Sequence, residues 1–283
     1  MERISQNVPK NWNYFLFGDS HIGARLRHTK GWDKLVKMMN RPYHGVDCNL
    51  GIDHGDMIEA ITVDDPRYCE YDTLEQNILN QMYSAQKALW PIRDKLVCGL
   101  DGNHPYKLHK FGDITRQICK EVGIKYGGYS AVITFKNKGK TQFKHYAHHG
   151  SGQINSVADD PERKLVNMLI SLKRKLSPMM SDCLLMSMGH THKFLILPPS
   201  KELYLTTNND GTIEQHYTEG KHAEYIHPNH RWYVNTSTFL RLLDNEGGGS
   251  GYGERALFPP NENGFAVAEI RNGKILRINK EVI

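Results

Sequence analysis

Residues 14–21 of this chain read Tyr14-Phe15-Leu16-Phe17-Gly18-Asp19-Ser20-His21. The apolar run predicts a buried strand, and Gly18 predicts the turn that ends it. At the carboxyl edge of an open α/β sheet, such a turn is where ligands are held. Because Asp19 and His21 are two apart in a loop, both can turn toward one cation. Alternatively, Asp19 caps a following helix and His21 is a polar surface residue.

The same design, a strand followed by glycine and ligand-type residues, returns four more times along the chain. The later segments are Gly55-Asp56-Met57-Ile58-Glu59, Gly102-Asn103-His104, His148-His149-Gly150 and Gly189-His190-Thr191-His192. All five segments offer carboxylate, amide or imidazole ligands and no thiolate, a set that suits Mn²⁺, Fe or Zn²⁺ rather than a soft-metal site. Two ligands from the first segment, one from each of the next three and two from the last make seven. With one carboxylate shared, seven ligands fill about four positions on each of two ions and leave room for water and substrate.

Between these segments the apolar pattern alternates between strand and helix spacing. Strands are predicted at 47–52, 95–98, 130–135, 142–147 and 183–188, and helices at 32–39, 72–89, 111–122 and 161–176. After residue 193 the pattern gives short strands alone, at 194–197, 203–206, 232–238, 265–270 and 274–278. This order predicts a layered α/β domain whose last third completes a second sheet.

We expect one domain over residues 1–283, because no linker is long or biased enough to separate two. The irregular stretch around 199–231, which ends in a region rich in histidine and aromatic residues, is interpreted as an insertion or cap, or as a packed loop. The glycine-rich residues 245–253 form either a surface loop or a lid near the site.

The composition limits the class of protein. With 39% hydrophobic residues the chain can bury a sizeable core, yet no apolar run approaches the ~20 residues of a membrane span. Residues 1–7 have no apolar signal-peptide core. The five cysteines are scattered without a CxxC pair, which argues for a reducing compartment and against a disulfide framework or a cysteine–zinc site. We therefore expect a cytoplasmic protein without a membrane partner.

The five segments resemble, in order and spacing, the motifs DxH, GDxxx, GNH, HG and GHxH of the calcineurin-like metallophosphoesterase family. The likeness runs from Asp19 to His192 and implies a two-sheet β-sandwich flanked by helices, with two divalent metal ions. It implies that one ion is held by Asp19, His21 and His192, that Asp56 bridges, and that the second ion is held by Asn103, His190 and the histidine of the fourth motif. We favour His149 over His148 for that last ligand, because the family's ligand directly precedes a small residue. Manganese is the favoured metal, with Fe, Zn, Ni or Mg as alternatives.

His104 corresponds to the family's non-ligand catalytic histidine, which protonates the leaving-group oxygen or stabilises charge on the phosphoryl group. In the family an acidic residue commonly follows it, whereas Pro105 follows here. Asp101 or Asp53 could take that orienting role, or nothing does. The two ions implied by the resemblance would give a hydroxide that attacks phosphorus in line with the leaving group.

The details of the motifs favour phosphodiester hydrolysis. Residues 55–60 read GDMIEA and lack the arginine of the GDxxDRG motif of protein phosphatases, a bidentate phosphate clamp. The chain is therefore most similar to the DNA-repair exonuclease branch, as in bacterial or phage phosphoesterases, with DNA or RNA as the leading substrate. Basic residues expected on the rim of the site are Arg25, Arg27, His28, Lys30, Lys107, His109 and Lys110. The alternatives are a phosphomonoesterase acting on protein or nucleotide, and a non-catalytic nucleic-acid-binding subunit; the oligomeric state stays open.

Overall fold

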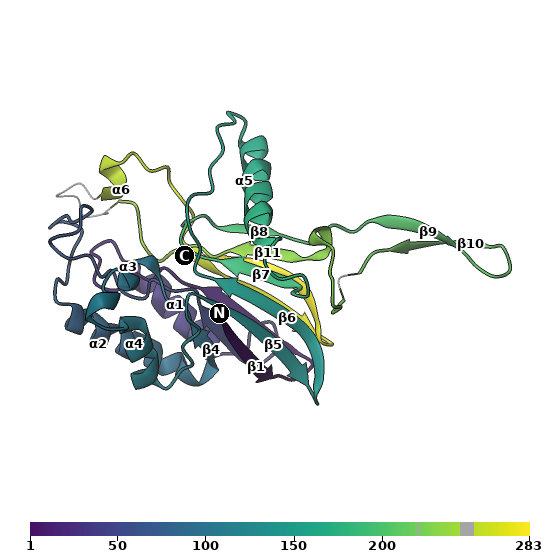
Figure 1. The fold of residues 1–283 in the computed structure, drawn as a ribbon, viewed down its shortest axis with the longest axis horizontal. Helices are drawn as coiled ribbons and strands as arrows, with labels where there is room; N and C mark the ends of the chain where they lie inside the picture. Colours follow the sequence, from purple (N-terminus) through teal and green to yellow (C-terminus); the bar gives the residue numbers. More distant parts are fainter. Residues whose placement is uncertain (220, 244–251) are drawn as a thin grey trace.

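A computed structural model of the chain describes residues 1–219, 221–243 and 252–283, and it has a mixed α/β fold of the α+β class. The six-stranded sheet has the order β1 (Glu2–Asn7), β5 (Ser130–Asn137), β6 (Lys140–His148), β7 (Leu185–Met188), β11 (Trp232–Asn235), β8 (Leu195–Leu197). The five-stranded sheet has the order β13 (Lys274–Val282), β12 (Gly264–Arg271), β2 (Trp12–Phe17), β3 (Asn49–Asp53), β4 (Leu96–Gly99). Figure 1 shows the two sheets lying over one another.

The place of strand β2 in the fold explains why residues 14–17 are an unbroken apolar run. All six of its residues are buried. Trp12, Tyr14 and Leu16 pack between the two sheets, where they meet side chains of β5, β6 and β12. Phe15 and Phe17 point to the other face and pack against helices. A strand buried on both faces has no polar positions to alternate with, so the continuous pattern follows from its central place.

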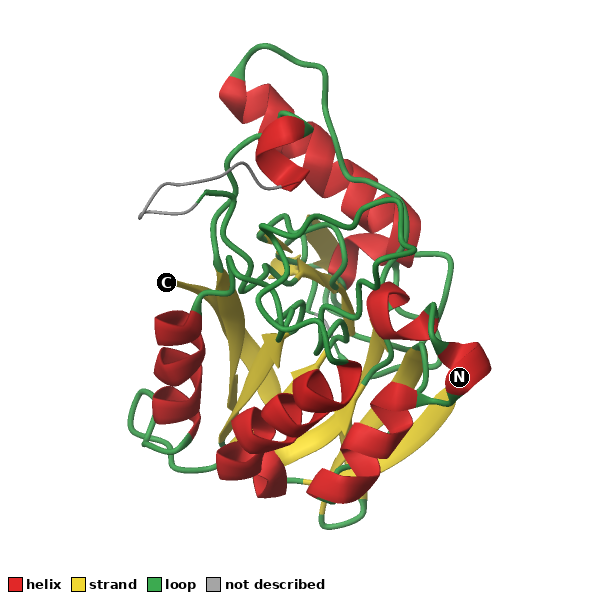
Figure 2. Cartoon of the chain, turned by 90° about the vertical axis from the view of Figure 1, so that its left-hand side faces the viewer, coloured by secondary structure: helices red, strands yellow, loops and turns green. Residues whose placement is uncertain are grey.

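Helices pack on the outer faces of both sheets, and Figure 2 shows them beside the strands. The helices α1 (Thr29–Met39), α2 (Ile78–Leu89) and α4 (Ile114–Val122) lie against the outer face of the five-stranded sheet. The helix α5 (Pro161–Leu176) packs on the six-stranded sheet through Leu172 and Leu176. The shorter helical elements are η1 (Trp90–Lys95), α3 (Asn103–Tyr106), η2 (His109–Phe111), η3 (Pro228–His230) and α6 (Tyr252–Arg255).

Two predicted helices begin later than expected. The pattern predicted a helix over 72–89, but α2 begins at Ile78, because the side chain of Asn77 caps it by accepting from Leu79 N at 2.9 Å. Leu79, one of the apolar residues of the predicted helix, is 59% exposed. Likewise α4 begins at Ile114 after the capping carboxylate of Asp113 rather than at residue 111. Apolar spacing locates a helix, whereas a capping side chain sets its first residue.

The expectation that the last third of the chain completes a second sheet is only partly right. The strands β8 and β11 join β1, β5, β6 and β7, but β12 and β13 join the sheet that begins with β2. The pairing of β12 with β2 is antiparallel. The last third of the chain therefore contributes two strands to each sheet. The first strand, β1, was not predicted because Ile4 is its only buried residue.

Part of the 199–231 stretch forms a hairpin of β9 (Leu203–Thr207) and β10 (Ile213–Tyr217). It projects from the body of the molecule (Figure 1). Most of the predicted loop or lid at 245–253 lies outside the described residues. Within the described part of the chain, no helix is long and apolar enough to cross a membrane.

A buried carboxylate ties the edge of the five-stranded sheet together. Glu269 of β12 is 2% exposed and accepts hydrogen bonds from Arg277 Nε at 2.6 Å, Asn279 Nδ2 at 2.7 Å and His44 Nδ1 at 2.9 Å. Burial alone would raise the pKa of Glu269, but these donors outweigh it and lower the pKa to about 2. The charged form is therefore the stable one in the folded chain.

Replacing Glu269 by glutamine is expected to flatten the dependence of stability on acid pH. A carboxyl group with a pKa of about 2 in the folded chain and 4.5 in the unfolded chain adds stability that is present above pH 4.5 and is lost as the pH falls toward 2. This difference between the two pKa values corresponds to about 3 kcal/mol in the free energy of unfolding. Urea unfolding from about pH 7 to about pH 3 should show wild type and Glu269→Gln converging in acid. The exposed Glu214→Gln is the control, and equal pH slopes for wild type and Glu269→Gln would contradict the account.

Candidate functional site

Five strands deliver the sequence-predicted residues to one edge of the molecule. Asp19 follows β2, Asp56 follows β3, Asn103 follows β4, His149 follows β6 and His190 follows β7. Backbone hydrogen bonds join the turns to one another: Asp19 N donates to Gly55 O, and Gly189 N donates to His149 O, each at 2.8 Å. Because the turns of both sheets meet here, side chains from distant parts of the sequence come within hydrogen-bond distance.

One group of side chains comprises Asp19, His21 and His192. His192 Nε2 lies 3.3 Å from Asp19 Oδ1 and 3.2 Å from His21 Nε2. His21 Nδ1 donates to Glu59 Oε2 at 2.7 Å, so in a neutral ring Nε2 carries no proton and is free to bind a cation. All three ligand atoms lie within 4.8 Å of one another, close enough to share one ion.

The second group comprises Asp56, Asn103, His149 and His190. Asn103 Oδ1 lies 2.6 Å from His190 Nδ1 and 2.9 Å from His149 Nε2, and Asp56 Oδ2 lies 3.3 Å from the same His149 nitrogen. His149 Nδ1 donates to the carbonyl of His54 at 2.7 Å. In a neutral ring, His149 Nε2 would therefore face two oxygen acceptors without a proton. A second proton or a cation must lie there, which fits a ligand set for a metal ion.

All seven residues predicted as ligands are thus brought together, and the alternative in which Asp19 caps a helix is wrong. Asp19 is fully buried and accepts from His190 N at 3.0 Å, while His28 caps the helix that follows. His149, not His148, reaches the cluster. The ring of His148 turns back to accept from Gly150 N at 2.7 Å.

The backbone at the site is held in an unusual conformation. Five of the seven candidate ligands have positive φ angles: Asp19 (53°), His21 (44°), Asp56 (50°), His190 (70°) and His192 (54°). Outside glycine this left-handed region costs about 1–2 kcal/mol per residue. Such residues cluster at functional sites, where the surrounding structure holds them in place.

Two glycines of the motifs allow the turns to approach closely. A Cβ atom on Gly102 would meet Asp56 Oδ1 at 2.0 Å, and one on Gly55 would meet the carbonyl of Asp101 at 2.2 Å. Gly55 also has a φ of +99°. A larger residue at either position would separate the second and third turns and pull Asp56 away from Asn103.

The electrostatics of the site are those of buried, paired charges. Burial opposes ionisation of Asp19 and Asp56, yet neighbouring His192 and His149 lower the pKa values of both carboxyl groups. Burial would lower the pKa of His149, but Asp56 raises it to about 9. Buried charges persist only when they are paired or bind metals. The carboxylates therefore need cationic partners, which protons on histidine or a metal ion can supply.

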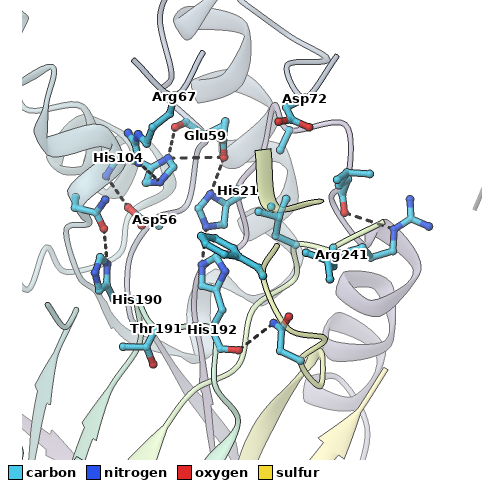
Figure 3. Close-up of a pocket in the computed structure, with 18 of the residues that line it drawn as sticks. His21, Asp56, Glu59, Arg67, Asp72, His104, His190, Thr191, His192 and Arg241 are labelled. Atoms are coloured by element: carbon cyan, nitrogen blue, oxygen red, sulfur yellow. Dashed lines mark hydrogen bonds and ion pairs between the residues drawn. The ribbon is translucent and has the colours of Figure 1, made fainter. Parts of the chain in front are cut away.

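His104 lies beside the cluster with partners that the sequence analysis missed. Its Nδ1 donates to the carbonyl of Glu59 at 2.6 Å, and its Nε2 accepts from Arg67 Nη1 at 2.9 Å (Figure 3). Burial lowers the pKa of His104. Glu59 stands three residues after Asp56 inside the second motif, so it was visible in the sequence. Arg67 comes from a loop without any motif.

The two acids considered for orienting His104 make their hydrogen bonds to other groups, which leaves the alternative in which neither acid orients it. Asp101 Oδ1 accepts from Thr115 Oγ1 at 2.7 Å and Gly102 N at 2.9 Å. Asp53 Oδ1 accepts from Gly55 N at 2.9 Å. Both carboxyl groups hold their own turns in place: Asp53 is the last residue of β3, and Asp101 follows the end of β4 by two residues.

A pocket of about 390 Å³ opens in front of the cluster (Figure 3). His21, Asp56, Asn103, His104, His190 and His192 form one wall. Apolar side chains, among them Leu26, Ile61, Leu240, Phe258 and Pro259, form much of the rest. Three basic residues, Arg67, Lys193 and Arg241, also line it.

The basic residues expected on the rim do not line this pocket within the described part of the chain. Lys107 is paired with Asp65 at 2.8 Å, and the guanidinium of Arg27 lies over the ring of Trp32. No described residue of the 199–231 stretch lines the pocket either. The cationic groups that line the pocket therefore differ from the basic residues predicted on its rim.

No protein-family model matches this chain, and no curated protein matches its sequence.

Proposed function

We propose that this chain is a metal-dependent phosphoesterase of the calcineurin-like metallophosphoesterase type that hydrolyses phosphodiester bonds. One observation carries the proposal. Seven oxygen and imidazole donors, contributed by turns after five strands of two sheets, converge in two adjacent groups. Two sheets with helices on their outer faces also fit the sandwich that the resemblance implies.

The donor set assigns residues to two divalent cations, with manganese favoured. Asp19, His21 and His192 would hold one ion, Asn103, His149 and His190 the other, and Asp56 would be shared. When bound, such a pair supplies an activated water and offsets the charge of the phosphoryl oxygens. Glu59 and the carbonyl of His54 orient His21 and His149 by accepting from their Nδ1 atoms.

We assign Arg67 to the phosphoryl oxygens and His104 to the leaving group. Asp65 holds the guanidinium through Nε at 3.1 Å and Nη2 at 3.0 Å, which aims Nη1 into the pocket at His104. An arginine does not give up its proton, so His104 Nε2 is an acceptor in this arrangement. A phosphate that takes over Nη1 would free His104 Nε2, which could then take up a proton from water and donate it to the leaving oxygen.

The lining of the pocket supports a diester substrate. A phosphodiester carries an organic group on each side of phosphorus, and the apolar wall around Leu240 and Phe258 offers a place for one of them. The face of an aromatic ring such as Phe258 can stack on a base of single-stranded DNA or RNA. Arg67, however, supplies the kind of phosphate clamp whose absence argued against a monoesterase, so phosphomonoester hydrolysis is the second candidate.

The first test measures hydrolysis of bis-p-nitrophenyl phosphate and p-nitrophenyl phosphate by metal-free protein to which Mn²⁺ is added back. We expect Mn²⁺-dependent activity with a preference for the diester, and loss of that activity in Asp56→Ala. His149→Ala should lower kcat/KM by at least about 100-fold, since even the loss of an outer partner of a ligand costs about 10–100-fold. His148→Ala, the neighbouring control, should stay within about threefold of wild type.

The absence of hydrolysis with any divalent ion would refute the proposal and favour a non-catalytic nucleic-acid-binding subunit. Equal effects of His148→Ala and His149→Ala would refute the ligand assignment. A preference for p-nitrophenyl phosphate would select the monoesterase.

A second test concerns Arg67. Arg67→Ala should lower kcat/KM by about 10–100-fold, because a hydrogen bond to a charged group contributes about 1.5–3 kcal/mol. The manganese content should not change, since Arg67 is not a proposed ligand. The exposed Arg25→Ala, in which the removed guanidinium lies over Tyr71 outside the pocket, is the control. Unchanged kinetics for Arg67→Ala would remove Arg67 from the mechanism.

A further inference from the structure

A second cluster of metal-binding side chains lies outside the candidate site. Glu202, His227 and His230 each offer one ligand atom, and these atoms lie within 4.8 Å of one another. Glu202 precedes β9 at the start of the projecting hairpin. Beyond the hairpin, His227 directly precedes the short helix η3 and His230 is the last residue of that helix. The cluster therefore joins the two points at which the 199–231 stretch leaves and rejoins the body of the molecule.

One nitrogen of this cluster stands out. His230 Nε2 is shielded from solvent and makes no hydrogen bond to any residue that the structure describes. Glu202 Oε1 lies 3.8 Å away, which is too long for a hydrogen bond. A buried polar atom without a partner costs about 1–3 kcal/mol. A cation between the carboxylate and the ring would satisfy both groups.

The backbone that carries the histidines is fixed in place. Arg231 is 1% exposed and donates from Nε to Ile226 O at 2.8 Å and from Nη1 to Ser177 O at 3.1 Å. Tyr233 donates from its hydroxyl to Pro228 O at 2.9 Å. A metal site needs ligands held by their surroundings, and these bonds hold the loop on both sides of His227 and His230.

A further residue supports the carboxylate. Asn229 Nδ2 donates to Glu202 Oε1 at 3.2 Å, and Lys173 of α5 donates to Asn229 Oδ1. Hydrogen bonds of this kind orient the ligands of a metal ion. His227 Nδ1 accepts from Asn229 N at 3.2 Å, a long bond that an ion at this nitrogen would replace.

We propose that Glu202, His227 and His230 bind one Zn²⁺ ion that closes the base of the β9–β10 hairpin. Two imidazoles and one carboxylate are a known ligand set for zinc, with water in the fourth position. Ligands about 2.0–2.1 Å from a tetrahedral ion lie about 3.3 Å apart, so Glu202 and His230 need to approach by only about half an ångström. The ion links the start of the 199–231 stretch to its end.

The experiment counts zinc on the full-length, metal-free chain by competition with a chromophoric chelator. Wild type should bind one equivalent more than His230→Gln and one more than Glu202→Gln. The matched control is His222→Gln, which removes an exposed histidine of the same stretch outside the cluster and should bind as much as wild type. Circular dichroism and thermal unfolding identify any variant that does not fold. Glu202→Gln, at an exposed position, keeps the test decisive if His230→Gln fails to fold.

Equal zinc counts for wild type, His230→Gln and Glu202→Gln would overturn the proposal, as would an equal loss in His222→Gln. The result is separable from the proposed phosphoesterase. If the candidate site also binds two zinc ions, wild type should bind three equivalents and each of the two cluster variants two. If the candidate site binds none, wild type should bind one equivalent and each cluster variant none. The difference of one equivalent persists in either case.

Discussion

Two fully buried carboxylates, those of Asp19 and Asp56, set the conditions at the edge where the two sheets meet. Removing a charge from water is unfavourable unless the surroundings replace the lost solvation. Here His192 and His149 face the two carboxylates at 3.3 Å each. The outer nitrogens of His21 and His149 are already engaged by Glu59 and by the carbonyl of His54, which leaves the inner nitrogens to face the carboxylates and the amide of Asn103.

Buried hydrogen bonds between the strands below this edge support the turns that carry the two carboxylates. His54 Nε2 and His145 Nε2 are hydrogen-bonded to Ser187 Oγ at 2.5 Å and 2.6 Å, and Tyr14 OH to His145 Nδ1 at 3.1 Å. This series of hydrogen bonds links β2, β6 and β7 directly beneath the turns. It joins the sheets through polar side chains in an otherwise apolar core. Buried polar groups of this kind persist when all are satisfied, and they then favour one arrangement of the core. The left-handed backbone at the ligands is held by this support and by the close approach of the turns at Gly55 and Gly102.

The sequence predicted which residues converge better than it predicted where helices begin and which strands pair. The convergence of the candidate ligands was predictable because each segment that carries them follows an apolar strand, and the ends of neighbouring strands meet at one edge. The starts of α2 and α4 were missed because capping by Asn77 and Asp113 is a local side-chain contact, not a periodic pattern. The return of β12 to pair with β2 joins residues about 250 positions apart, and strand propensity alone does not choose a partner. Arg67 was missed because a loop residue gains its role only when Asp65 aims it at His104.

If the seven converging side chains hold a pair of cations, both ions will be visible by anomalous diffraction at the manganese edge, in crystals of the full chain grown with Mn²⁺. We expect two neighbouring peaks, one among Asp19, His21 and His192 and one among Asn103, His149 and His190, with Asp56 in contact with both. A map without density at this edge of the sheets, at saturating manganese and with the side chains ordered, would contradict this expectation.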